Sequence, residues 1–223
     1  MPIAKTVIAP SLLDPGNHAL ILIDHQYLRL LTVRSHETRV VIGAATLLAK
    51  GAKLFGVRTL ITTAIAARQA LVKEIQEVFP ELSPIDRTTL NAFEDERVVS
   101  WAQAASRGKL VLAGLCTETA VAMTALSALS AGFEVYVVSD ASRGASKESH
   151  EMAMERVIAA GAVPLTAAAY LEELQRDWAR DATAAQALTI IQQHGGGCGE
   201  FGVGPHVIAL GINLIGEPTA NVQ

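Results

Sequence analysis

The sequence predicts an α/β fold: a three-layer α/β/α sandwich with a mostly parallel sheet of about five or six strands. Short apolar runs alternate along the chain with longer segments of helical period, which is typical of βαβ units. Glycine follows several of the helical segments, where it is a preferred C-terminal cap. Half of the 223 residues are apolar but only 4% are aromatic, so the core is aliphatic and suits parallel strands beneath alanine-rich helices.

Strands are expected where β-branched and aliphatic residues form short runs bounded by turn residues. These runs cover residues 19–23, 57–62, 110–113, 134–139 and 162–165. Helices are expected where apolar residues recur with helical period and a glycine or proline ends the segment. These segments cover residues 36–55, 68–79, 94–106, 117–131, 147–160 and 167–180. The alternation predicts a sheet in which neighbouring strands run parallel.

One domain is expected over residues 1–194, because no linker or internal repeat interrupts the pattern there. Residues 195–199 are glycine-rich and break the composition. Residues 200–223 are apolar with little period, and we expect residues 195–223 to form a C-terminal arm that docks on the domain or on a neighbouring subunit. Since a monomer with such an arm would expose a large apolar patch, the sequence predicts a homo-oligomer.

The composition excludes several classes of protein. With a net charge of −4, a pI of about 5.9 and no basic face, the chain is not expected to bind nucleic acid. No apolar run is long enough to predict a membrane span, and the N-terminus lacks the pattern of a signal peptide. The two cysteines, Cys116 and Cys198, are too few for a disulfide scaffold. These features predict a soluble cytoplasmic protein.

No cofactor and no metal are expected. Asp24-His25-Gln26 follows the first strand, at the point where a dinucleotide-binding fold carries its glycine-rich loop. His25 beside Asp24 is a weak metal signal, because no other histidine lies near it in the sequence. The motif Gly-x-Ser-x-Gly of the serine α/β-hydrolases is also absent.

Three places carry reactive side chains beyond the carboxyl ends of strands, where the site of an open parallel sheet lies. The first is Asp24, whose pKa burial would raise, although a capping or turn aspartate is the commoner role. The second is Arg87, which either holds a carboxylate or pairs with Asp86 at the surface. The third is the strand-to-helix segment 114–126, where a thiol would be activated, although Cys116 also suits a small buried apolar position.

Four short motifs occur along the chain in an order and spacing that match a known family. They are Leu22-Ile23-Asp24-His25-Gln26, the segment 87–93, the segment 114–126 and the segment 135–142. Together they resemble the isochorismatase-like hydrolases, also called the cysteine hydrolase superfamily, over residues 15–180. The segments 91–95 and 175–178 are similar to the YcaC-like branch, whose substrates are poorly defined.

The resemblance implies a catalytic triad of Asp, Lys and Cys that hydrolyses C–N bonds of small molecules. Asp24 matches the aspartate, which takes the thiol proton. Arg87 stands where lysine is usual, and keeps the positive charge without serving as a base. Ala120 occupies the nucleophile position, and a methyl group cannot attack a carbonyl carbon. The chain is therefore expected to be an amide-hydrolase scaffold that is inactive as written, through engineering or natural loss of the nucleophile.

The resemblance also implies features around these residues. Backbone N–H groups near Cys116 and Thr117 would hold the oxyanion, with a cis peptide bond on one side of Cys116. Gln26, Asn91 and Phe93 would complete the pocket. Members of the family assemble as tetramers or octamers, which implies the same for this chain.

Other functions stay open. A non-covalent vinyl-ether hydrolase would use Asp24 as a general acid and need no cysteine. A catalytically silent oligomeric binding protein would be favoured by an Arg87 that faces solvent, whereas Asp24 and Arg87 in one closed site would favour catalysis. Cys116 as a replacement nucleophile ranks last, because a four-residue shift moves the sulfur by several ångströms and catalysis tolerates about 1 Å.

Overall fold

One sheet of six strands organises residues 8–105 and 107–195, which are the residues that the computed structural model describes. Its order is β3-β2-β1-β4-β5-β6, and every neighbouring pair is parallel. The predicted α/β class and parallel sheet are confirmed. The strands are β1 (His18–Ile23), β2 (Arg58–Ala64), β3 (Ile85–Arg87), β4 (Lys109–Gly114), β5 (Glu134–Val138) and β6 (Val163–Leu165).

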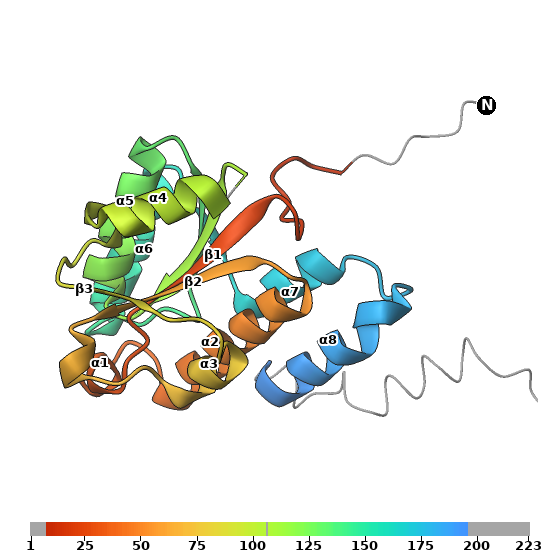
Figure 1. Ribbon diagram of the computed structural model, residues 1–223, viewed down its shortest axis with the longest axis horizontal. Helices are drawn as coiled ribbons and strands as arrows, with labels where there is room; N and C mark the ends of the chain where they lie inside the picture. The colour runs from red at the N-terminus through yellow and green to blue at the C-terminus, as the bar shows by residue number, and fades with distance from the viewer. Residues whose placement is uncertain (1–7, 106, 196–223) are drawn as a thin grey trace, which may run out of the picture.

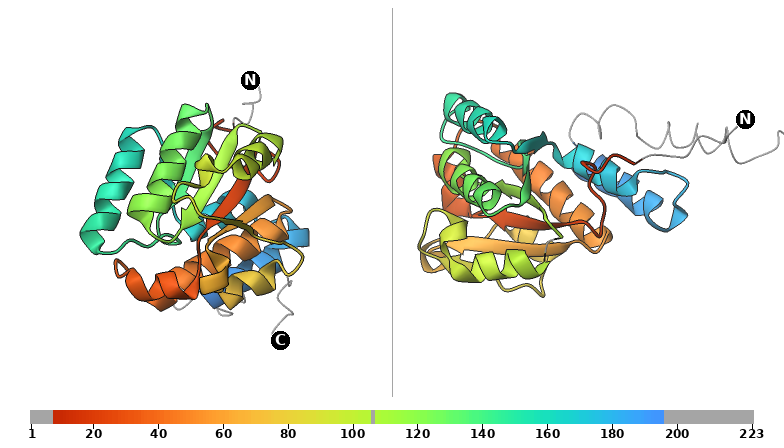
Figure 2. Two further views of the ribbon diagram at one scale, coloured as in Figure 1. Left: turned by 60° about the vertical axis from the view of Figure 1, so that its left-hand side comes forward. Right: turned by 90° about the horizontal axis from the view of Figure 1, so that it is seen from above.

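Helices cover both faces of the sheet and complete the three layers (Figure 1; Figure 2). One face carries α2 (Thr38–Leu54), α3 (Lys73–Val78), α7 (Ala167–Gln175) and α8 (Asp181–His194). The opposite face carries α4 (Glu96–Ala105), α5 (Ala122–Ser130) and α6 (Lys147–Ala159). A short helix, α1 (Tyr27–Thr32), follows β1 after the segment 24–26.

Strand β1 lies in the middle of the sheet and is buried along its whole length. Leu20 and Leu22 pack into the apolar cluster under α2 and α7, whereas Ile21 and Ile23 pack into the cluster under α4 and α5. Because successive side chains of a strand point to opposite faces, a strand covered on both sides needs an uninterrupted apolar run. This requirement explains the run of residues 19–23 in the sequence.

The observed elements differ from the predicted ones in a few places. The predicted helix over residues 68–79 is wrong in its first part, since the chain runs through a 3-10 turn (Ala66–Arg68) and forms a helix only at α3. The predicted helix over residues 167–180 ends earlier, at Gln175, because Arg176 adopts a left-handed conformation. The sequence analysis missed β3, α1 and α8.

The C-terminal arm expected over residues 195–223 lies outside the described residues, apart from Gly195 at the end of α8. Its docking therefore stays a prediction. Among the described residues, no helix is long and apolar enough to cross a membrane. Within the same ranges, no cluster of three or more His, Cys, Asp or Glu side chains has the geometry to hold a metal ion.

Candidate active site

The order of the strands places a topological switch point between β1 and β4. From β1 the chain continues to β2 on one side, and from β4 it continues to β5 on the other, so a crevice forms at their carboxyl ends. Ile23 and Gly114, the last residues of these strands, are register partners. A Cβ atom on Gly114 would lie 2.5 Å from the carbonyl oxygen of Ile23, so only glycine fits there. The segments that follow β1 and β4 therefore leave the sheet side by side.

A buried ion pair joins Asp24, directly after β1, to Arg87 at the end of β3. Arg87 Nη2 donates to both Oδ1 and Oδ2 of Asp24 at 2.9 Å. The side chains of Arg87 and Asp24 are 0% and 4% exposed. Thr62 on β2 also donates its hydroxyl to Asp24 Oδ1, at 3.4 Å. The sequence analysis placed these two residues among its candidates, and the structure brings them into contact.

Arg87 does not pair with Asp86 at the surface, so that alternative is wrong. Successive side chains of a strand point to opposite faces, which separates Arg87 from its neighbour. Asp86 accepts hydrogen bonds from the Thr63 hydroxyl, at 2.9 Å, and from the Ala66 amide, at 2.8 Å. Arg87 instead uses Nη1 for the carbonyl oxygens of the loop that follows β3, at Thr89 and Leu90.

Burial raises the pKa of the Asp24 carboxyl above its ordinary value. The guanidinium groups of Arg87 and Arg29 act in the opposite direction, as does the Thr62 hydroxyl. A carboxyl group that is paired with a cation but desolvated can gain or lose a proton closer to neutral pH than an exposed one. This is the property that a general acid or base requires.

The turn after β4 is built by a left-handed residue, Cys116, with φ 64° and ψ 68°. The amides of Cys116 and Thr117 both donate to the carbonyl oxygen of Arg143, at 2.8 and 3.2 Å. The expected cis peptide bond beside Cys116 is wrong, since the described residues contain none. The left-handed conformation turns the chain with trans bonds, and Arg143 takes up the two N–H groups that the resemblance assigned to an oxyanion.

Position 120 and Cys116 lie on different sides of this turn. Ala120 belongs to a π-helical turn (Thr117–Val121) before α5, is 3% exposed, and lies in the same apolar cluster as Ile23 and Ala92. Cys116 packs with a separate cluster beside α1 and the start of α2. Burial raises the pKa of the Cys116 thiol, so burial works against a thiolate there.

Gln26 ties together the ends of two strands. Its Oε1 accepts from the Ala64 amide at 2.9 Å and its Nε2 donates to the Gln69 carbonyl at 2.7 Å. Thr117 shares a 2.9 Å hydrogen bond between its hydroxyl and His150 Nδ1. Both side chains are buried and hold loops of the candidate site in place.

Asn91 and Phe93 lie on the α4 and α5 side of the sheet. Asn91 Oδ1 accepts from the Phe93 amide at 3.0 Å, and its Nδ2 donates to the Ser127 hydroxyl at 2.9 Å. The Phe93 ring makes an edge-to-face contact with Phe133, with centroids 6.0 Å apart. These contacts show both side chains shaping the loop that follows Arg87.

Buried polar atoms without a partner mark the same edge of the sheet. Seven buried side-chain atoms have no hydrogen-bond partner among the described residues. All seven belong to segments at or after the carboxyl ends of β1 to β5, and native proteins leave few buried polar atoms without a partner from the protein or from ordered water. They are His25 Nδ1, Arg29 Nε, Gln69 Oε1, Arg87 Nε, Thr89 Oγ1, Glu118 Oε2 and Arg143 Nε.

Strained backbone marks this edge as well. Four described residues other than glycine have positive φ, and three of them, Asp24, Ile65 and Cys116, follow the ends of β1, β2 and β4. Such conformations cost of order 1–3 kcal/mol each and tend to gather at active sites. Sequence reasoning found Asp24 but missed Ile65, because nothing in its residue type predicts a left-handed conformation.

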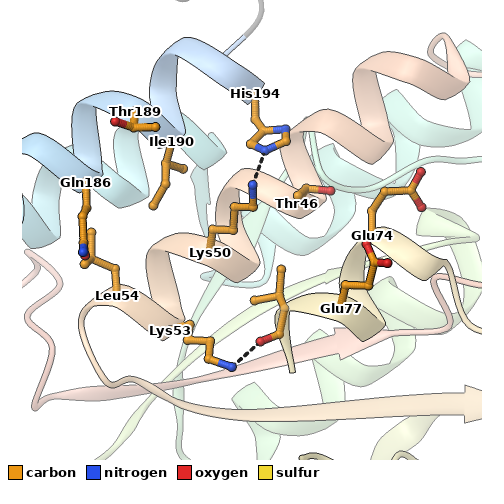
Figure 3. Close-up of a pocket in the computed structure, with 11 residues that line it drawn as sticks. Thr46, Lys50, Lys53, Leu54, Glu74, Glu77, Gln186, Thr189, Ile190 and His194 are labelled. Carbon is orange, nitrogen blue, oxygen red and sulfur yellow. Dashed lines mark hydrogen bonds between the residues drawn. The ribbon is translucent and has the colours of Figure 1, made fainter. Parts of the chain in front are cut away.

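A second candidate region is a groove between α2, α3 and α8, with a volume of about 670 Å³ (Figure 3). Lys50 on α2 points to His194 on α8, and Lys53 points to the carbonyl of Val78. Glu74 on α3 also lines the groove. A neighbouring hollow of about 590 Å³ shares Glu74 and His194 with it.

The switch point, the buried carboxylate–guanidinium pair and the strained turns define an α/β protein with a candidate catalytic carboxylate at the carboxyl edge of its sheet. The comparison with protein families agrees, since the isochorismatase domain matches residues 18–169. The chain therefore belongs to the isochorismatase family.

Individual relatives confirm the similarity to YcaC-like hydrolases. The probable hydrolase YcaC of Escherichia coli K12 is 36% identical over 172 residues, which cover 76% of this chain and 83% of that protein. The crystal structure of E. coli YcaC, described as an octameric hydrolase of unknown specificity, matches with a TM-score of 0.82 and 31% identity, over 91% of this chain and all of that one. YcaC from Pseudomonas aeruginosa, solved with hexane-2,5-diol and covalent acrylamide, matches with a TM-score of 0.82 and 30% identity, over 92% of this chain and all of that one.

Proposed function

We propose that this protein has the scaffold of a hydrolase that cleaves C–N (amide-type) bonds of a small molecule, with Ala120 at the position of the catalytic nucleophile. The buried pair of Asp24 and Arg87 at the switch point carries the proposal. The covalent acrylamide on P. aeruginosa YcaC supports a reactive nucleophile in a YcaC-like site, since acrylamide is an electrophile that a nucleophile attacks at its vinyl carbon. Because position 120 carries a methyl group, the chain as it stands lacks the atom for a covalent step.

An Ala120→Cys variant would supply that atom. The thiol proton passes to the Asp24 carboxylate, and a bond forms between Sγ and the carbonyl carbon of the amide. The C–N bond then breaks, and the leaving nitrogen takes the proton from Asp24. Water cleaves the thioester, which releases a carboxylic acid and restores the thiol. Arg87 cannot take the proton at neutral pH and serves to position Asp24.

The test is a panel of small amides with release of ammonia or amine as the measurement. We expect Ala120→Cys to hydrolyse at least one amide that the unchanged chain leaves intact. Ala120→Ser is the matched control, because it has nearly the same size but a weaker nucleophile. Asp24→Asn in the cysteine background should abolish turnover, whereas Cys116→Ala should leave most of it.

Two results would contradict the placing of the nucleophile. One is a folded Ala120→Cys chain that hydrolyses none of the amides. The other is a covalent acyl adduct on Cys116 of the unchanged chain, seen by intact mass.

A second candidate is non-covalent hydrolysis of a vinyl ether with Asp24 as general acid. The raised pKa of Asp24 favours it, since a protonated carboxyl group is the required acid. The unchanged chain should then hydrolyse a vinyl ether of the isochorismate type, and Asp24→Asn should not. The silent binding protein loses its main support, because Arg87 is buried against Asp24 and does not face solvent.

We also propose that the chain assembles as a homo-oligomer, a tetramer or an octamer. The octameric state of E. coli YcaC supports this assembly. Light scattering that gives the 23.5 kDa of a single chain would contradict it.

A further inference from the structure

The proposed function leaves Arg29 without a task. It lies on α1, five residues after Asp24, and is half-buried. Its Nε is buried without a hydrogen-bond partner, and the guanidinium forms no hydrogen bond or ion pair with any other described residue. A partly desolvated guanidinium without partners is unfavourable unless another group satisfies it.

The charge of Arg29 acts on both Asp24, after β1, and Cys116, after β4. It acts to lower the pKa of the Asp24 carboxyl and that of the Cys116 thiol. Asp24 is already paired with Arg87 through both of its oxygens. The positive charge of Arg29 therefore stands beside the switch point without a carboxylate of its own.

Neighbouring charged groups do not provide that carboxylate. Glu118 accepts from the Ala145 amide at 3.1 Å and lies against Gly144, so it faces the loop after β5. The Arg143 guanidinium is held by the Leu30 carbonyl at 3.2 Å and by the Thr38 hydroxyl at 2.7 Å. Arg29 differs from both in having all of its donors free of partners within the described chain.

We propose that Arg29 binds an anionic group of the substrate, so that the substrate class is a small amide that also carries a carboxylate. The inference rests on the proposed function and deepens it. A guanidinium offers paired N–H donors that match the two oxygens of a carboxylate, and such charge-assisted pairs are strong and directional. Arg29 is then a specificity-determining residue, while Asp24 serves the chemistry.

The test compares two probes of similar size, succinamate and succinamide, which differ by one carboxylate. Binding to the unchanged chain is measured by calorimetry, so no turnover is needed. We expect succinamate to bind more tightly, and Arg29→Gln to weaken its binding by about ten- to hundredfold without weakening that of succinamide. Arg29→Lys should recover part of the loss. Arg34→Gln, at an exposed arginine of the next loop, is the matched control and should change neither probe.

A second measurement does not depend on a ligand. Because Arg29 lowers the pKa of the Cys116 thiol, Arg29→Gln should move the pH dependence of thiol alkylation upward, and Arg34→Gln should not.

The outcomes separate this inference from the proposed function. Succinamate that binds no more tightly than succinamide, or whose binding survives Arg29→Gln, overturns the role of Arg29 even if Ala120→Cys hydrolyses amides. Arg29-dependent binding of succinamate upholds that role even if Ala120→Cys proves inactive.

Discussion

The carboxyl edge of the sheet and the groove between α2, α3 and α8 differ in the state of their charged groups. The ion pair of the edge, Asp24 with Arg87, is almost fully buried, whereas Lys53 and Glu81 beside the groove are 46% and 57% exposed. The edge also holds the unpartnered buried atoms and three of the strained residues. The groove is a sizeable hollow (Figure 3). Buried polarity and strain therefore distinguish the edge, whereas volume distinguishes the groove.

The largest expected difference between the two regions is the effect of removing a cation. Arg87→Met leaves the Asp24 carboxylate buried and unpaired, and should lower the free energy of unfolding by about 3–5 kcal/mol. Lys53→Met breaks only an exposed pair and should cost less than about 1 kcal/mol. Urea denaturation of both variants checks this. Equal effects would show that the two pairs are equally solvated.

The pH dependence of stability should also differ between the regions. Burial lowers the pKa of His25 at the edge from 6.5 to about 4, so the unfolded chain binds this proton first. Stability should be highest above pH 6.5 and fall as the pH drops towards 4, with a slope of roughly 1.4 kcal/mol per pH unit from this histidine.

The comparison of variants isolates that slope. His25→Asn should flatten the fall, as measured by urea denaturation at several pH values. His194→Asn in the groove should flatten it less, because His194 is only partly buried. If His194→Asn flattened the pH dependence of stability more than His25→Asn, the expected difference between the two regions would be wrong.

Strain at the edge predicts an unusual sign for a glycine substitution. Ile65 has φ 55° and is 41% exposed, so the strain that Ile65→Gly relieves should outweigh the partial burial that it loses and stabilise the protein by up to about 1 kcal/mol. Thr189, an exposed β-branched residue on α8 that lines the groove, is the matched control. Thr189→Gly should destabilise by a few tenths of a kcal/mol, because glycine is the poorer helix former. Thermal denaturation of the two variants distinguishes the signs.

The smallest expected effect lies in the groove. Burial lowers the pKa of His194, and the Lys50 ammonium, 2.7 Å from His194 Nε2, lowers it further. Lys50→Gln should therefore move the pKa back towards its ordinary value by a fraction of a unit. An NMR titration of the imidazole measures the shift, and no shift would mean that Lys50 is fully solvated.

Much of the fold follows from the sequence because its signals are local. Residues 19–23 are apolar without interruption, which is what a strand covered on both faces requires. β3 was missed because it has three residues and two of them are charged. α8 was missed because its alanine- and threonine-rich sequence has a weak apolar face, and its packing against α2 decides its place.

The candidate site was predicted only in part, for physical reasons. Asp24 and Arg87 can both be singled out from the sequence. Asp24 follows an apolar run, and Arg87 begins the motif of residues 87–93. Their pairing depends on the sheet order, since Arg87 must reach over β2 to meet Asp24. Arg29 has no recognisable sequence signal, because its proposed role rests on the absence of a partner within the described chain.

The central place of β1 has a consequence for synthesis on the ribosome. β1 is complete at Ile23, but β4, its neighbour on one side, begins only at Lys109. Until β4 has emerged, that edge of a strand that is apolar from Ala19 to Ile23 stays open to pairing with another chain. The long interval between the two strands also slows folding, since distant contacts must form before the sheet closes. The nascent chain is thus exposed to mispairing between the synthesis of β1 and that of β4, the two strands whose ends carry the candidate site.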